Sequence, residues 1–259
     1  MNELFSIAGK VAVITGAGGV LGGNIAQHFV QQGAKVVAID IRQEQLDNRI
    51  EELKQYGQDV IGIIGDVLDI ASLEKVAEEI VTQWGQIDIL LNIAGGNMPG
   101  ATLEPDQNFY DMDISCWEKV TSLNMNGTVY PSMIFGKVMA EQKKGCIINV
   151  SSMAAYSAIT RVPGYSAAKT AVANFTQWLA SEMALKYGDG IRVNAIAPGF
   201  IQTPWHENRT PESYERINRK IALHRFGEIK DVADMAYSIL TNNYMNGSIV
   251  DIHGGYDYF

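Results

Sequence analysis

The stretch Val11-Ala12-Val13-Ile14-Thr15-Gly16-Ala17-Gly18-Gly19-Val20-Leu21-Gly22-Gly23 leads from an apolar strand pattern, through a glycine-rich turn, into a helical pattern. Glycines at such a turn allow the backbone to bend sharply and to approach a bound group closely. The free N–H groups and the positive dipole end at the start of the next helix favour a pyrophosphate. The spacing departs from the common G-x-G-x-x-G fingerprint because position 21 is leucine. Taken alone, the turn fits a cofactor site and a purely structural connection equally well.

The same strand-to-helix alternation continues along the chain. The expected strands are Val11–Thr15, Lys35–Ile39, Asp59–Ile64, Ile87–Asn92, Gly145–Ser151, Ile191–Ala197 and Ser248–Ile252. The expected helices are Leu21–Gln32, Gln43–Tyr56, Ile70–Trp84, Trp117–Gln142, Tyr165–Tyr187 and Lys230–Thr241. The strands are nearly continuous in Val, Ile and Leu, which is typical of parallel strands buried on both faces. Repeated βαβ units predict one doubly wound α/β domain of the Rossmann type over residues 1–259.

Composition excludes several classes of function. The 259 residues are 47% hydrophobic and 19% charged, with a formal net charge of −9. This acidic balance argues against nucleic acid or an anionic membrane as a partner. The start of the chain does not resemble a signal peptide, no apolar run is long enough to span a bilayer, and only two cysteines occur. We therefore expect a cytoplasmic protein without a disulfide framework.

Two long segments, residues 95–115 and 198–226, interrupt the alternation, and each follows the carboxyl end of an expected strand. In open α/β sheets this edge is where ligands bind. Loops of this length in a compact domain are usually functional or disordered. We interpret residues 198–226 as a substrate lid.

Asp40 ends the second expected strand, where an acidic side chain can accept hydrogen bonds from an adenosine ribose. A carboxylate there repels a 2′-phosphate, so NAD is favoured over NADP. Arg42 is a counter-indication, because an arginine just past the strand can bind that phosphate. A helix N-cap is the less favoured alternative role for Asp40. At the same sheet edge, Asp66 with Val67 and the run Asn92-Ile93-Ala94-Gly95 are candidates for the adenine and ribose pocket.

Tyr165 and Lys169 stand at positions i and i+4 of an expected helix, so they share one helix face. A cation close to a phenol favours the phenolate and lowers its pKa. A tyrosine tuned in this way can exchange a proton with a substrate oxygen. An isolated pair with this spacing is more often a solvated helix surface, so the pair depends on the rest of the chain for its interpretation.

Together these features resemble the short-chain dehydrogenase/reductase family over essentially the whole chain. The matching residues are Thr15-Gly16-x-x-x-x-x-Gly22, Asp66, Asn92-x-Ala94-Gly95, Asn124, Ser152, Tyr165-x-x-x-Lys169 and Pro198-Gly199-x-x-x-Thr203. The resemblance implies a Rossmann fold with seven parallel strands, a nicotinamide cofactor and an Asn–Ser–Tyr–Lys catalytic set. Two positions depart from the family pattern, namely Val20 in place of a glycine and Ile93 in place of a second asparagine.

The resemblance also implies a role for each matched residue. Tyr165 is the general acid and base, Lys169 lowers its pKa and binds the nicotinamide ribose, and Ser152 orients the substrate oxygen, with Ser151 as the alternative. Asn124 would hold a water molecule that links Lys169 to solvent. The expected cofactor-binding residues are Gly16, Gly18, Gly19, Val20, Leu21, Asp40, Asp66, Val67, Asn92, Ala94, Gly95, Tyr165, Lys169, Pro198, Gly199, Ile201 and Thr203.

Within the family, the chain resembles the fructuronate reductases, also called D-mannonate oxidoreductases. The matching runs are Gly16–Gly22, Ala94-Gly95-Gly96-Asn97 and Asn174-Phe175-Thr176-Gln177-Trp178-Leu179-Ala180. A sugar acid needs hydroxyl and amide partners and a cation, and an arginine can bind a carboxylate through two hydrogen bonds. The expected substrate-binding residues are Asn97, Ser152, Tyr156, Arg161, Tyr165 and Arg209. No metal site is expected.

Three alternative functions remain open from the sequence: a dehydrogenase of a neutral sugar or polyol, a 3-oxoacyl reductase, and a cofactor-binding protein without catalysis. The expected helices Trp117–Gln142 and Tyr165–Tyr187 carry apolar residues all round, more than one core face requires. The family resemblance implies a homotetramer, and the aromatic tail Tyr256–Phe259 is a candidate for packing across a neighbouring subunit.

Overall fold

Seven parallel strands form one sheet in the order β3-β2-β1-β4-β5-β6-β7 in the computed structural model, which describes residues 6–157, 161–204 and 210–256. The strands are β1 (Val11–Thr15), β2 (Lys35–Asp40), β3 (Val60–Ile64), β4 (Ile89–Asn92), β5 (Gly145–Val150), β6 (Ile191–Pro198) and β7 (Ile249–Ile252). The strand order reverses at β1, because β1 pairs with β2 on one side and with β4 on the other. A ligand crevice is expected outside the carboxyl ends of the strands at such a switch point. The predicted doubly wound fold is confirmed.

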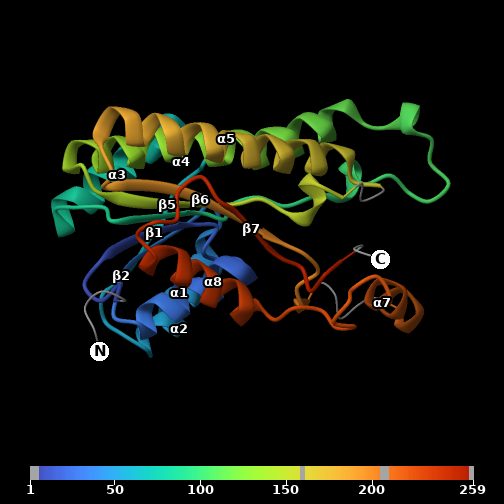
Figure 1. The fold of residues 1–259 in the computed structure, drawn as a ribbon, viewed down its shortest axis with the longest axis horizontal. Coiled ribbons are helices and arrows are strands. Elements are labelled where there is room, and N and C mark those ends of the chain that lie inside the picture. The colour runs from blue at the N-terminus through green and yellow to red at the C-terminus, as the bar shows by residue number, and fades with distance from the viewer. Residues whose placement is uncertain (1–5, 158–160, 205–209, 257–259) are drawn as a thin grey trace.

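Helices cover both faces of this sheet (Figure 1). They are α1 (Val20–Gln31), α2 (Gln43–Lys54), α3 (Ile70–Trp84), α4 (Ile114–Gln142), α5 (Pro163–Tyr187), α7 (Pro211–Asn218) and α8 (Ile229–Thr241). Helices α3, α4 and α5 lie on one face, and α1, α2 and α8 lie on the other. Each layer encloses its own apolar core, with Phe135 of α4 fully buried on the first face and Phe29 of α1 fully buried on the second. Because helices cover every inner strand on both faces, the sequences of these strands are nearly continuous runs of apolar residues.

Helices α4 and α5 begin more than one residue earlier than the sequence pattern predicts. Helix α4 starts at Ile114 because the Asp113 carboxylate accepts a hydrogen bond from the Ser115 N–H (2.8 Å). Helix α5 starts at Pro163, and proline is well suited to the first helical position. Tyr165 therefore lies within the first turn of α5.

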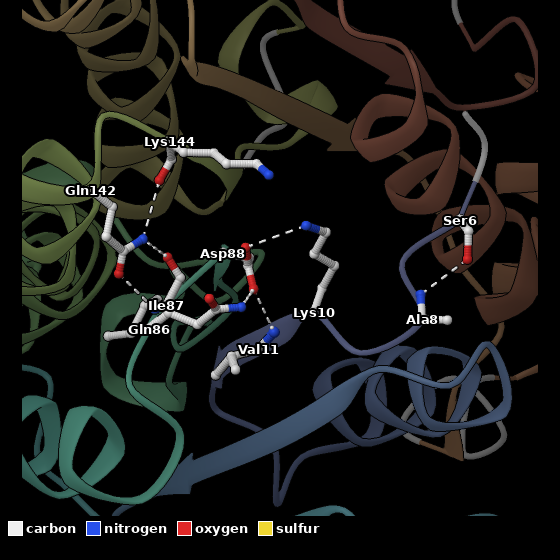
Figure 2. Close-up of polar contacts among 9 residues, drawn as sticks. All are labelled: Ser6, Ala8, Lys10, Val11, Gln86, Ile87, Asp88, Gln142 and Lys144. Carbon is white, nitrogen blue, oxygen red and sulfur yellow. Dashed lines mark hydrogen bonds and ion pairs between the residues drawn. The ribbon is translucent and has the colours of Figure 1, made fainter. Parts of the chain in front are cut away.

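The amino ends of the central strands are joined by side chains (Figure 2). Asp88 accepts hydrogen bonds from the Val11 N–H (2.9 Å) and the Gln86 side chain (2.7 Å), and it lies 3.6 Å from the Lys10 ammonium. The Gln142 side chain bonds both the N–H and the carbonyl of Ile87. Ile87, predicted as strand, thus pairs with a helix end, and β4 begins at Ile89.

The expected lid, residues 198–226, contains helix α7 and a small apolar core. Ile217, Ile221 and Phe226 are its buried members, and the tail residue Tyr256 packs against them. Ile221 and Tyr256 also form an antiparallel bridge. Tyr256 therefore packs within its own chain, and the rest of the proposed inter-subunit tail, residues 257–259, lies outside the described residues. Over the described part of the chain, no helix has both the length and the apolar character needed to cross a membrane.

Candidate active site

A cleft of about 640 Å³ opens at the carboxyl ends of β1, β2, β4 and β5. Its lining residues are Gly16, Gly19, Val20, Leu21, Gly22, Ile39, Asp40, Ile41, Arg42, Gly65, Asp66, Val67, Leu68, Ile93, Ala94, Gly95, Gly96, Leu123, Val150, Tyr165 and Lys169. The structure thus brings the glycine turn, the acidic end of β2 and the Tyr165–Lys169 pair to one cavity. Most of the predicted cofactor-binding residues lie on its wall.

The glycine turn fits a phosphate group in close contact with the backbone. Gly16 has a φ of 68°, a left-handed conformation that glycine adopts without strain. A Cβ atom on Gly22 would lie 2.4 Å from the Gly16 carbonyl oxygen, so α1 could not begin this close to the turn with a larger residue. Helix α1 follows Gly19, and no side chain caps its first N–H groups. These donors suit an anion.

The Asp40 carboxylate is buried at the end of β2 and fastens the glycine turn. It accepts hydrogen bonds from the Gly18 N–H (3.1 Å), from the Arg42 N–H (3.1 Å) and from the Arg42 Nε (3.0 Å). The hydrogen bond from Arg42 to Asp40 raises the pKa of the guanidinium. The alternative role of Asp40 as a helix cap is not seen, because Arg42 occupies the N-cap position of α2.

The turn after β4 lies against the turn after β1. The Thr15 hydroxyl accepts hydrogen bonds from the N–H groups of Ile93 and Ala94 (3.1 Å each). Asn92, by contrast, is 1% exposed and does not line the cleft. Its Nδ2 atom donates to Ser132 Oγ (2.9 Å) and to Asn149 Oδ1 (2.8 Å), so it joins β4 to α4 and β5. Asn92 thus has a structural role inside the fold, and its cofactor contact stays a prediction.

Tyr165 and Lys169 come from the first turns of α5 and face the cleft. The Lys169 ammonium lies 5.6 Å from the centre of the Tyr165 ring and donates to the Val150 carbonyl oxygen (2.8 Å). Lys169 is 3% exposed. A buried ammonium with a carbonyl partner is not a solvated helix surface, so that interpretation of the pair is wrong.

The pKa values of this pair differ from the expectation. Burial raises the pKa of Tyr165, while a hydrogen bond with Ser152 lowers it, and burial is the larger effect. Burial also lowers the pKa of Lys169 to about 8. Because burial is the larger effect, the pKa of the phenol in the protein alone shifts upward, opposite to the predicted lowering. At neutral pH the Tyr165 hydroxyl keeps its proton, which suits donation to a substrate oxygen.

The two candidate serines have different partners. The Ser151 hydroxyl donates to the backbone carbonyl of Lys169 (2.9 Å) and thereby ties β5 to α5. The Ser152 hydroxyl accepts from the Ala154 N–H (3.1 Å) and forms the hydrogen bond with Tyr165. Ser152 is thus the serine that shares a hydrogen bond with the Tyr165 phenol.

Asn124, on α4, is fully buried and bonds the backbone of Gly96 in both directions, with Gly96 N–H to Oδ1 at 3.0 Å and Nδ2 to the Gly96 carbonyl at 2.7 Å. A Cβ atom on Gly95 would lie 2.7 Å from Asn124 Oδ1 and 3.5 Å from Lys169 Nζ. Asn124 therefore holds the end of the β4 turn close to Lys169.

The predicted nicotinamide-side residues follow β6, beside the main cleft. Pro198 ends β6, and the Gly199 N–H donates to the Ile252 carbonyl (2.8 Å). A Cβ atom on Gly199 would lie 2.5 Å from His253 Cβ, so the chain needs glycine there. Ile201 is buried and forms a bridge with Gly227. These residues, and Thr203 after them, are not among those that line the described cleft.

The predicted substrate-binding residues are less concentrated. The Asn97 Nδ2 atom donates to the Thr102 hydroxyl (2.6 Å), and Arg161 pairs with Glu104 (3.0 Å). Tyr156 is 57% exposed, and both burial of its ring and the charge of Asp251 raise its pKa. Arg209 lies outside the described residues. Within the described ranges no group of His, Cys, Asp and Glu side chains is arranged to hold a metal ion.

A model of the short chain dehydrogenase family matches residues 10–213. The chain belongs to the short-chain dehydrogenases. A Bacillus subtilis (strain 168) protein described as the uncharacterized oxidoreductase UxuB is 37% identical, over 97% of this chain and 96% of its own length. The 3-oxoacyl-[acyl-carrier-protein] reductase FabG of Thermotoga maritima is 33% identical, over 96% and 98% of the two chains.

Solved structures of short-chain dehydrogenases share the whole fold. A candidate D-mannonate oxidoreductase from Haemophilus influenza, solved with bound NAD, is 32% identical with a TM-score of 0.91 and covers 98% of this chain and 97% of its own. The family named from the sequence motifs is confirmed, and so is its subgroup likeness.

Sequence reasoning missed three structural residues of this short-chain dehydrogenase. Thr15 ties two turns together, Ser151 ties β5 to α5, and Gly18 donates to Asp40 rather than lining the cleft. Thr15 had a detectable signal, since a hydroxyl at the end of a buried apolar strand needs a hydrogen-bond partner. The other two roles depend on distances across the fold.

Proposed function

We propose that the chain is an NAD(H)-dependent oxidoreductase that interconverts a carbonyl and an alcohol, with a sugar acid of the fructuronate/D-mannonate type as substrate. The observation that carries this proposal is one cleft with an anion-binding glycine turn at one end and the Tyr165–Lys169 pair at the other. The turn suits a pyrophosphate, and the pair suits proton transfer at a substrate oxygen.

The residues present fit a dinucleotide. The glycine turn would hold the pyrophosphate, the edge formed by Asp66 and Val67 would hold the adenine, and Asp40 would face the adenosine ribose. NAD supplies the hydride when it is bound. The Asp40 carboxylate disfavours a 2′-phosphate, although Arg42 offsets part of its charge through their ion pair (3.0 Å). The likeness to an NAD-bound structure over nearly the whole chain supports the same choice.

The catalytic side chains of this chain supply proton transfer and orientation. In the reduction direction, Tyr165 donates its hydroxyl proton to the substrate oxygen as the alcohol forms. Ser152, already hydrogen-bonded to that hydroxyl, would bind the same oxygen and hold it within reach. Lys169 places a cation beside the phenol and stabilises the phenolate left after transfer.

Sugar acids are favoured by the relatives, and one feature favours a second candidate. A solved structure that is similar over nearly the whole chain is described as a candidate D-mannonate oxidoreductase. However, Arg161, one of two predicted carboxylate partners, is paired with Glu104. A neutral polyol or ketone is therefore the second candidate, and a meso-2,3-butanediol dehydrogenase of Serratia marcescens is 32% identical over 95% of this chain and 94% of its own.

A rate panel tests the substrate. The purified protein is assayed with fructuronate, tagaturonate, a neutral ketose and an acyl ketone, each with NADH and with NADPH. We expect kcat/KM for the best keto-acid with NADH to exceed that for the neutral ketose by at least about tenfold, the worth of one charge-assisted hydrogen bond. A faster neutral ketose would support the second candidate. Tight NADH binding without reduction of any carbonyl would support a non-catalytic binding protein.

We also propose that the chain forms a homotetramer through α4 and α5. Met133 on α4 is 59% exposed, and Trp178 and Leu185 on α5 are 57% and 84% exposed. Large apolar side chains on two adjacent helices favour burial against another subunit. Light scattering of the wild-type protein and of Trp178→Glu tests the proposal, with a lower mass expected for the variant and an unchanged mass as the contrary result.

A further inference from the structure

The loop of residues 96–104 follows the turn after β4, and its first residue is bonded to helix α4. Gly96 forms two hydrogen bonds with the Asn124 side chain (3.0 and 2.7 Å). Inside the loop, the Asn97 side chain donates to Thr102 Oγ1 (2.6 Å) across the short helix η2 (Pro99–Ala101). The loop is therefore closed on itself and anchored at Asn124.

The other end of the 96–104 loop is held by Arg161, in the turn that precedes α5. The Leu103 N–H donates to the Arg161 carbonyl (2.9 Å), and Arg161 Nε donates back to the Leu103 carbonyl. The Arg161 NH2 atom also donates to Glu104 Oε2 (3.0 Å). The planar guanidinium allows one side chain to make both bonds, which lysine cannot reproduce.

The backbone of Arg161 is itself unusual, with a φ of 77°. Residues other than glycine seldom adopt this left-handed conformation, and the surrounding contacts must hold them there. Helix α5 begins two residues later at Pro163, and Tyr165 lies in its first turn. The direction of the chain at Arg161 thus sets where the turn carrying Tyr165 begins.

We propose that Arg161 is a positioning residue: through the 96–104 loop it fixes Tyr165 on α5 relative to Asn124 on α4. Its contacts join the 96–104 loop to the turn before α5, and it does not serve as a ligand for the substrate carboxylate. This inference rests on the proposed carbonyl reduction, but it does not depend on the substrate being a sugar acid. It replaces the substrate-binding role that the sequence suggested for Arg161.

The test compares Arg161→Ala, Arg161→Lys and Glu104→Gln with the wild type, on one anionic and one neutral carbonyl substrate that the wild type reduces. Lys186→Ala is the matched control, since it breaks an exposed ion pair with Glu182 at the far end of α5. NADH affinity, the melting temperature and hydrogen exchange of the 96–104 amides are measured alongside. Hydrogen exchange reports on the contacts between Arg161 and the 96–104 loop even if no substrate is turned over.

For Arg161→Ala we expect kcat/KM to fall about 10- to 100-fold for both substrates alike, since a misplacement near 1 Å costs about 10²-fold. Arg161→Lys should not restore activity, Glu104→Gln should lower it a few-fold, and the 96–104 amides should exchange faster in both alanine and lysine variants. NADH affinity and the Lys186→Ala control should match the wild type. The Glu104 side chain is 71% exposed, so Glu104→Gln decides the question if Arg161→Ala does not fold.

Three results would overturn the proposal. One is a loss confined to the anionic substrate and restored by lysine, which would make Arg161 a carboxylate ligand. Another is higher activity on the anionic substrate in Glu104→Gln, because Arg161 freed from its ion pair with Glu104 would then bind the substrate carboxylate. The third is unchanged amide exchange and activity in Arg161→Ala. Failure of the proposed function is distinguishable, since it appears as a wild type that reduces no carbonyl.

Discussion

The proposed cofactor half and the proposed substrate half of the active site are held together by different kinds of contact. On the cofactor side, the turn after β1, the end of β2 and the turn after β4 meet through buried groups, with Thr15 at 0% and Asp40 at 4% exposure. On the substrate side, long segments are held by exposed side chains such as Arg161 and Glu104, at 43% and 71%. The sheet topology dictates the first half, whereas the contacts between loops determine the second.

This difference predicts separable defects. Changes in the strand-end turns should alter cofactor affinity, and changes in the long segments should alter reaction with the carbonyl substrate. Tyr165 and Lys169 lie where the two halves meet, so their substitution should affect chemistry most.

The largest effect is expected for Tyr165→Phe. Removing the hydroxyl removes the proton donor, and general acid catalysis contributes about 10²- to 10⁴-fold. Turnover should fall by that factor while NADH affinity, measured by fluorescence titration, stays within about twofold. Turnover near the wild-type rate would remove Tyr165 from this role.

Gly22→Ala tests the cofactor half alone. The new Cβ would lie 2.4 Å from the Gly16 carbonyl oxygen, so the turn must shift, and NADH affinity should fall by about 100-fold or more. Gly136→Ala on α4 is the matched control, because its Cβ would meet Ile147 of β5 at 3.7 Å, an ordinary van der Waals contact. The control should keep NADH affinity and stabilise the fold by about 0.5–1 kcal/mol. Equal NADH affinity in both variants would contradict the role of the turn.

The buried Lys169 makes stability depend on pH. Because its pKa is lowered to about 8, the folded protein binds fewer protons than the unfolded chain between about pH 8 and 10.5. Wild-type stability should therefore rise across this window, by up to about 3 kcal/mol from this group. Lys169→Met should lack this rise, so the unfolding free energy of the wild type minus that of the variant should increase as pH rises from about 8 to 10.5. Urea unfolding at several pH values measures it, and a difference independent of pH would contradict the burial.

Asp40→Ala should change cofactor choice. Loss of the carboxylate removes the repulsion of a 2′-phosphate and frees Arg42 to bind it, so the ratio of NADPH to NADH efficiency should rise about tenfold. NADH affinity should also fall, because the Gly18 N–H loses its acceptor. Adding Arg42→Ala should cancel the NADPH gain. An unchanged ratio in the single variant would place ribose selection elsewhere.

The smallest effect is expected for Tyr256→Ala, in the apolar core beneath the proposed lid. Tyr256 packs against Phe200, with ring centres 5.6 Å apart, so its loss should loosen residues 198–226. KM for the carbonyl substrate should rise a few-fold with NADH affinity unchanged, since this residue lies away from the cofactor cleft. A selective loss of NADH binding would contradict the assignment of Tyr256 to the substrate half.

The sequence predicted the cofactor half better than the substrate half, for a physical reason. Strand and helix periodicity, together with Gly16, Asp40 and Tyr165, define the sheet order and therefore which ends of strands meet. Periodicity carries no information about which long loops bond to each other, so the Arg161–Glu104 contact could not be anticipated. The direction of the Tyr165 pKa shift was missed because burial depends on the assembled fold.

Hydride transfer from the cofactor to a carbonyl is the central claim, and isotope transfer tests it most directly. The wild-type protein is mixed with NADH deuterated at the transferring C4 position and with the carbonyl substrate that it reduces fastest, and the alcohol product is analysed by mass spectrometry. We predict one deuterium on the carbinol carbon of the product and none in the Tyr165→Phe reaction at equal time. A product without deuterium, or no product despite bound NADH, would contradict the account.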